Sequence, residues 1–313
     1  MDAVPWKFVD SVVELFGMDT LNQMEREVRH PLWKDVVDLH HRNRVYYRVD
    51  FRKKEGGIKH VSDGKEVSMR TIRKKGRFAR IVIVCDSTRD RYIFNWDEVE
   101  TLGEADATKL LETVAPLIDP ASGEFWSSWG SLDCTNWILT SLFKRVYLRR
   151  IIIPYCGQIA YDFLEDQINN SPCLSSVDIS GENWPKSALD LMTDFCLKGR
   201  PGKLVYATFG RGIHLDSSYI QNLLDLWKEN RNLNFQLLST DYRVDKEGLQ
   251  AVMEKGTLTW HCNNLYRFFK HESEKSVVIL SNNSYLTMEC HYCECDKSER
   301  CQLKNKYSKC HKF

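Results

Sequence analysis

From about residue 145 onward, short apolar segments alternate with longer segments of helical periodicity, at a spacing of about thirty residues. The short segments predict strands centred on 148–153, 174–179, 204–207 and 235–238. Apolar residues three and four positions apart follow each of them and predict helices at 159–168, 188–195, 220–227 and 249–253. No such unit buries its own apolar face, so neighbouring units must stack. The pattern therefore predicts an α/β fold in which helices back a parallel sheet.

The first sixteen residues predict an amphipathic helical segment. Pro5 suits the first turn of a helix because proline has no backbone N–H to leave unpaired. The apolar residues that recur behind it, at spacings of three and four, are Phe8, Val9, Val12, Val13, Leu15 and Phe16. A short helical segment cannot bury such a face by itself, so another surface must cover it.

The pattern Val-Pro-x-x-Phe-Val-x-x-Val-Val-x-Leu from Val4, with Leu32-Trp33 further along, resembles an F-box. An F-box is a short helical module that binds a Skp-type adaptor of a cullin ubiquitin ligase. The opening Met-Asp-x-Val-Pro-x-x-Phe is especially similar to a family of F-box-like proteins that is expanded in nematodes. The resemblance implies adaptor binding through Val4, Pro5, Phe8, Val9, Val12, Val13, Leu15, Leu32 and Trp33. The alternative interpretation is a helix that packs onto its own domain.

The repeating region carries a second resemblance. Phe163-Leu164-Glu165-Asp166-Gln167, the segment 174–179 and Trp184-Pro185 together resemble the F-box-associated, FTH-type region of nematode F-box proteins, which implies a target-binding role. The β-α alternation is leucine-rich-repeat-like, although the Leu-x-x-Leu-x-Leu-x-x-Asn consensus is absent. We expect four parts: F-box-like helices (1–43), a small α+β unit (44–144), the repeats (145–285) and a Cys-rich tail (286–313).

The C-terminal segment has the densest cluster of metal-ligand residue types. Cys290 and Cys293 form a Cys-x-x-Cys pair, a spacing that lets two thiolates reach one tetrahedral ion. The candidate ligands are Cys290, Cys293, Cys295, Cys301 and Cys310. No standard zinc-finger spacing is matched, so structural zinc, a reduced metal-free tail and redox chemistry stay open as interpretations. An all-thiolate site leaves no open coordination position, so no catalytic role follows.

Charge and motifs exclude several classes of function. The chain has 44 basic and 43 acidic residues, a net charge of +1, so nothing draws the whole molecule to nucleic acid or to an anionic membrane. It has no signal-peptide pattern and no run of eighteen apolar residues, so we expect a cytoplasmic, possibly nuclear, protein that does not span a membrane. It also lacks Gly-x-Ser-x-Gly, His-Glu-x-x-His, Walker-type and dinucleotide-binding motifs, and we expect no enzymatic activity.

The sequence and its resemblances thus predict a non-catalytic, substrate-recruiting subunit of a Skp-cullin-F-box ubiquitin ligase. Its N-terminal helices would bind the adaptor, and the repeats would bind a protein target. The alternative is a stand-alone interaction protein whose N-terminal helices cap the repeats.

Overall fold

The computed structural model describes residues 4–62, 69–90, 96–241, 245–261, 264–296, 301–307 and 311. The chain divides into two compact units, Met1–Leu174 (unit 1) and Ser175–Phe313 (unit 2). Both combine helices with a sheet, so the predicted α/β class is confirmed. In the described part of the chain, no helix has the length and apolar character needed to cross a bilayer.

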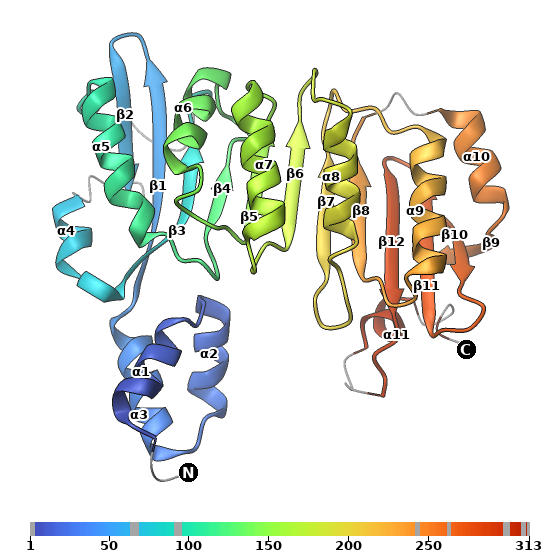
Figure 1. Ribbon diagram of the computed structural model, residues 1–313, viewed down its shortest axis with the longest axis horizontal. Coiled ribbons are helices and arrows are strands. Elements are labelled where there is room, and N and C mark those ends of the chain that lie inside the picture. Colours follow the sequence, from blue (N-terminus) through green and yellow to red (C-terminus); the bar gives the residue numbers. More distant parts are fainter. Residues whose placement is uncertain are drawn as a thin grey trace. The chain divides into compact units, whose positions relative to one another are not determined.

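Unit 1 begins with three helices and continues into a five-stranded sheet (Figure 1). Its helices are α1 (Trp6–Glu14), α2 (Met18–Glu27), α3 (Pro31–Asn43), α4 (Met69–Lys74), α5 (Glu104–Val114), α6 (Leu132–Leu142) and α7 (Gln158–Asn170), with short 3-10 turns at η1 (Gly76–Phe78), η2 (Trp96–Glu98) and η3 (Ala115–Leu117). Its strands are β1 (Val45–Lys54), β2 (Gly57–Ser62), β3 (Ala79–Asp86), β4 (Glu124–Trp126) and β5 (Arg150–Pro154). The order is β2-β1-β3-β4-β5, and only β2 runs antiparallel to its neighbour.

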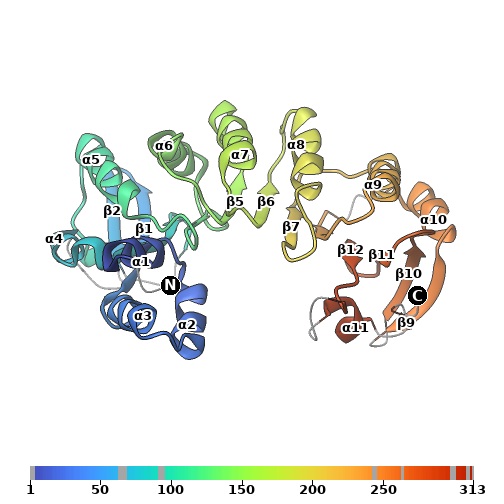
Figure 2. The same ribbon diagram turned by 60° about the horizontal axis from the view of Figure 1, so that its bottom comes forward.

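The core of unit 1 lies between this sheet and helices α5 to α7 (Figure 2). Phe51, Phe125 and Ile151 come from three strands and are fully buried. The Phe51 ring meets Trp137 of α6 edge-on, with the ring centroids 5.6 Å apart. Such aromatic pairs add packing energy beyond the apolar area that they bury.

Unit 2 contains three β-α pairs followed by an antiparallel set of strands. Its strands are β6 (Ser176–Ser180), β7 (Val205–Phe209), β8 (Phe235–Ser239), β9 (Thr257–His261), β10 (Asn264–Lys270), β11 (Ser276–Asn282) and β12 (Leu286–Tyr292). Its helices are α8 (Ser187–Cys196), α9 (Ser217–Glu229), α10 (Lys246–Glu254) and the short α11 (Gln302–Lys306). The order is β6-β7-β8-β12-β11-β10-β9, parallel from β6 to β8 and antiparallel beyond.

The predicted alternation of strands and helices is confirmed from β5 through α10. In unit 2, α8 to α10 cover one face of the sheet (Figure 2). The loops between strand and helix are joined to the loop of the next β-α pair: the Gly181 amide donates to the Arg211 carbonyl at 2.8 Å, and the Gly212 amide donates to the Asp241 carboxylate at 3.1 Å. Asp216 and Asp245 accept hydrogen bonds from first-turn amides of α9 and α10, which fixes where these helices begin.

The structure differs from the sequence-based division in two places. Residues 286–292 are not part of a tail but form β12, which pairs with β8 on one side and β11 on the other. The strand was missed although its apolar residues Leu286, Met288 and Cys290 alternate with polar ones, the period typical of a half-buried strand. The sheet also starts well before residue 145, since β5 pairs in parallel with β4 and belongs to unit 1.

Candidate functional site

The three N-terminal helices share a small core of their own. Val9 and Val13 of α1, Leu21 of α2, and Val36 and Val37 of α3 are almost fully buried in it. The partly buried residues around this core are Val4, Phe16, Met24, Leu32 and Trp33. Five of the nine predicted adaptor-binding residues thus hold these helices together: Val4, Val9, Val13, Leu32 and Trp33.

The remaining predicted residues form a stripe on the outside of α1. Pro5, Phe8, Val12 and Leu15 follow at i, i+3, i+7 and i+10, which places them along one side of a helix. Phe8 is 56% exposed and Leu15 71% exposed, while Val12 is half-buried. We call these four residues the apolar stripe. Large exposed apolar side chains in a row mark a surface that a partner can cover.

A polar seam joins the helices to the sheet of unit 1. The Asp10 carboxylate of α1 lies 2.9 Å from Nε2 of His40 on α3 and accepts a hydrogen bond of 3.1 Å from Arg77. Burial alone would raise the pKa of Asp10, but the hydrogen bonds from Arg77 and His40 hold it below its ordinary value. Burial lowers the pKa of His40, whose ring packs edge-on against Phe78.

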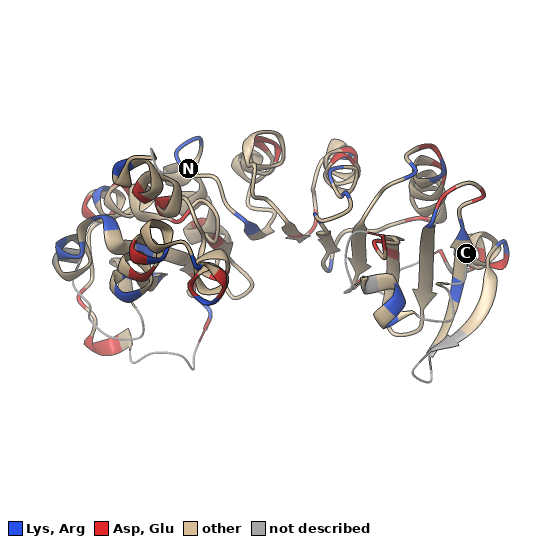
Figure 3. Ribbon diagram, turned by 90° about the horizontal axis from the view of Figure 1, so that it is seen from below, with Lys and Arg blue, Asp and Glu red and all other residues tan. Residues whose placement is uncertain are grey.

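Arg44, directly after α3, extends this seam. Its guanidinium donates to the backbone carbonyls of Val13 (2.8 Å) and Glu14 (3.0 Å). It also donates to the carbonyl of Phe16, so it caps the C-terminal end of α1, where the helix dipole favours a cation. Arg80 of β3 contacts the Glu14 carboxylate at 3.4 Å. Figure 3 shows acidic and basic positions interspersed over these helices.

The face of the unit 1 sheet that points away from α5 to α7 carries a cavity of about 330 Å³. Trp126 of β4 lies there between two guanidinium groups, Arg48 at 5.7 Å and Arg150 at 5.5 Å from the ring centroid. Trp129, at the rim of the cavity, is 67% exposed. Aromatic and Arg side chains are the residue types that dominate protein-protein interfaces.

The C-terminal segment forms a compact group of four metal-ligand side chains: Cys293, Cys295, Cys301 and His311. The Nε2 atom of His311 lies 3.1 Å from the sulfurs of Cys293 and Cys295, and the sulfurs of Cys293 and Cys301 are 4.0 Å apart. All four ligand atoms lie within 4.8 Å of one another. A tetrahedral zinc ion would require S···S separations of about 3.8 Å and S···N separations of about 3.5 Å. The group can therefore hold a metal ion of this size.

The crowding of these thiols shifts their pKa values. Desolvation and the neighbouring thiols raise the pKa of Cys295 to about 11. Burial acts in the same direction on Cys301, but hydrogen bonds from the backbone amides of Lys304 and Glu294 bring the pKa of that thiol below its ordinary value. Several thiolates this close together repel one another, and a divalent cation removes that cost.

One predicted ligand, Cys290, is not part of this group, and another lies outside the described residues. Cys290 lies on β12, where successive side chains point to opposite faces, and it is buried near Cys196 of α8. It is therefore on the opposite face of the sheet from Cys293, and burial raises its thiol pKa. Cys310 is outside the described residues.

Sequence reasoning missed several residues that the structure brings forward. His311 belongs to the C-terminal cluster of ligand-type residues in the sequence but was not among the predicted ligands. Trp6 of α1 and Met18 of α2 also expose apolar surface on the N-terminal helices. Asp10 and His40 gave no signal because their pairing joins two helices that are far apart in the sequence.

Comparisons of the chain with models of known protein families, with curated proteins and with solved structures returned no match.

Proposed function

We propose that this protein is the substrate-recruiting subunit of a Skp-cullin-F-box type ubiquitin ligase, acting without catalysis of its own. The observation that carries the proposal is the apolar stripe. It lies on a helical segment that has its own core, and it stays open to solvent in the described structure. An adaptor subunit would cover the stripe, while other subunits of the ligase would transfer ubiquitin. Such an adaptor works in the cytoplasm or nucleus, and we propose this location.

The stripe offers enough apolar surface to matter for binding. Burying a Leu or Phe side chain completely contributes about 1.5–3 kcal/mol. Phe8 and Leu15 are a little more than half exposed, so covering both would contribute about 3 kcal/mol, or roughly a hundredfold in affinity.

The target would bind to the sheet faces that the helices leave open. In unit 1 this face carries the cavity beside Trp126 and Trp129. Its mixture of aromatic rings and guanidinium groups suits a folded or extended polypeptide.

The polar seam favours a second candidate function. Because Arg77 and Arg80 pair with Asp10 and Glu14 of α1, helices α1 to α3 could serve only to complete the fold of a stand-alone interaction protein. In that case no Skp-type adaptor would bind.

Calorimetry of the full-length chain with a nematode Skp-type adaptor tests the first proposal. We expect binding by the wild type and a loss of about a hundredfold in the Phe8→Asp, Leu15→Asp double variant. Leu132→Asp is the matched control, because Leu132 begins α6 and is 51% exposed. A folded wild-type chain that does not bind the adaptor would overturn the proposal and favour the stand-alone function.

We also infer that zinc is the ion held by Cys293, Cys295, Cys301 and His311, in a structural role. Four protein ligands complete a tetrahedral shell, so the ion would have no open position for a substrate or water. Metal analysis of the protein purified under reducing conditions should find one zinc per chain. A fully reduced, zinc-supplied protein without bound metal would contradict this assignment.

A further inference from the structure

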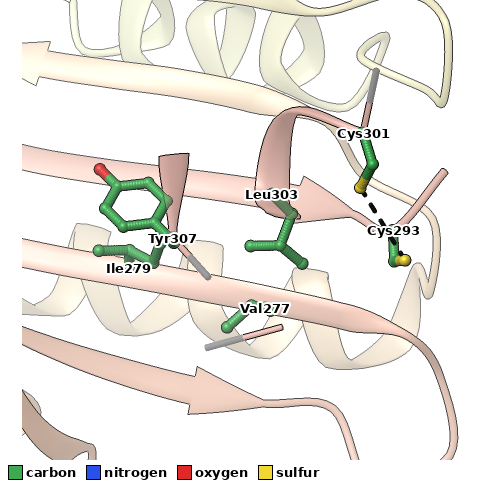
Figure 4. Close-up of a cluster of buried hydrophobic side chains, with 6 residues drawn as sticks. All are labelled: Val277, Ile279, Cys293, Cys301, Leu303 and Tyr307. Atoms are coloured by element: carbon green, nitrogen blue, oxygen red, sulfur yellow. Dashed lines mark hydrogen bonds between the residues drawn. The ribbon is translucent and has the colours of Figure 1, made fainter. Parts of the chain in front are cut away.

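The C-terminal segment covers an apolar patch on the sheet of unit 2. The patch lies on the face away from α8 to α10 and consists of Tyr266, Phe268, Val277 and Ile279. Leu303 and Tyr307 pack onto it and are themselves buried (Figure 4). Two of the metal-ligand residues, Cys293 and Cys301, belong to the same buried cluster.

This covering segment cannot hold its own conformation. Helix α11 has five residues, far below the length of about 12–15 at which isolated helices become marginally stable. Lys306 of the segment forms an ion pair with Glu289 of β12, at 2.7 Å and half-exposed on the lysine side. Ion pairs this exposed stabilise a structure only weakly.

We propose that zinc bound by Cys293, Cys295, Cys301 and His311 clasps residues 301–307 onto the apolar patch, so that the patch is covered only while the metal is bound. This inference rests on the assignment of zinc made above, and it is independent of adaptor binding.

The arrangement of the four ligands supports the clasp. Cys293 and Cys295 follow directly after β12 and are fixed to the sheet, since the Cys293 amide donates to the Lys275 carbonyl at 2.8 Å. Cys301 stands immediately before α11, and His311 comes after it. An ion shared by all four would therefore pin both ends of the covering segment to one point of the sheet. A ligand set within one turn would not do this.

Through the clasp, metal binding would control whether the apolar patch is exposed. The apolar patch lies on the face of unit 2 that its repeat helices leave open. With the segment released, four apolar side chains would face solvent, and such patches promote association.

Hydrogen exchange of the full-length chain, followed by mass spectrometry with and without a zinc chelator in reducing buffer, tests the inference. The reporters are the amides of Asn305 and Tyr307, which donate within the segment to Cys301 and Leu303. We expect their exchange to become at least tenfold faster on zinc removal. The amides of β6 to β8 should keep their rates.

Variants separate the ligands from their neighbours. Cys295→Ser and His311→Ala should reproduce the faster exchange in zinc-containing buffer, whereas Cys290→Ala should retain both zinc and protection. Unchanged exchange at Asn305 and Tyr307 after measured zinc loss would overturn the clasp and leave the zinc assignment standing. Faster exchange spread equally over β6 to β8 would also overturn it, because the ion would then stabilise the whole unit. A chain without zinc would overturn both.

Discussion

Replacing Asp10 by alanine should loosen the N-terminal helices from the sheet of unit 1. Asp10 is 7% exposed and serves both His40 and Arg77. Removing one partner of a buried ion pair costs about 3–5 kcal/mol, because the other charge stays uncompensated. The Arg77 side chain is 40% exposed, so water can solvate its guanidinium once the carboxylate is gone. We therefore expect a loss of about 2 kcal/mol.

The assay is native-state hydrogen exchange at pH 7, which reports the opening free energy of α1 and α3 separately from the rest of the chain. Asp10→Asn keeps the shape and loses the charge, and should cost about half as much. A double-mutant cycle with Arg77→Ala should give a coupling energy of about 1 kcal/mol. An effect of Asp10→Ala below about 0.5 kcal/mol would refute the reasoning, since it would place the seam among surface ion pairs of no consequence.

Three further predictions follow from the same structure. Burial lowers the pKa of His40 and His60, so these side chains take up protons at higher pH in the unfolded state than in the folded state. The free energy of unfolding should therefore decrease from about pH 7 to pH 5. The pKa of Asp10 is also lowered, so its protonation should add a loss of stability below about pH 4. Urea midpoints measure this, His40→Gln should reduce the slope above pH 5, and greater stability at pH 5 would contradict it. Val13→Asp places a carboxylate in the core of the N-terminal helices and should lower the free energy of unfolding by more than about 3 kcal/mol. Leu15→Asp should change it by no more than about 0.5 kcal/mol, because Leu15 is exposed. Circular dichroism during unfolding distinguishes the two variants, and equal effects would count against the exposed position of the stripe. Gly212→Ala should destabilise unit 2 by about 2 kcal/mol, because Gly212 has φ +95° and a Cβ there would lie 2.6 Å from the Gly181 carbonyl carbon. The control Gly202→Ala, at φ +81° but with open space around the position, should cost about half as much. Thermal unfolding measures both, and equal costs would show that crowding is not the cause.

The sequence by itself determined the local elements. The strands and helices from β5 to α10 lie where the spacing of apolar residues predicts them, because that spacing reflects which side of each element faces the core. The spacing of apolar residues also predicted an amphipathic α1. It could not tell which residues of a broad apolar face are buried: Val9 and Val13 pack inward in the core of the helices, while Phe8 and Leu15 remain exposed.

Only the tertiary structure decided which distant residues meet. Spacing alone paired Cys290 with Cys293, but Cys290 on β12 is buried near Cys196 of α8, whereas Cys293, just after β12, packs with Val277 and Ile279. The fold brings His311 to the cluster in place of Cys290. The apolar-polar alternation of residues 286–292 is typical of a strand, but only the structure shows that this strand pairs with β8 and β11. Asp10, His40 and Arg77 likewise come together only when the helices dock. Periodicity along the chain fixes which side of an element is buried, whereas contacts between elements depend on packing over long sequence separations, which no local pattern contains.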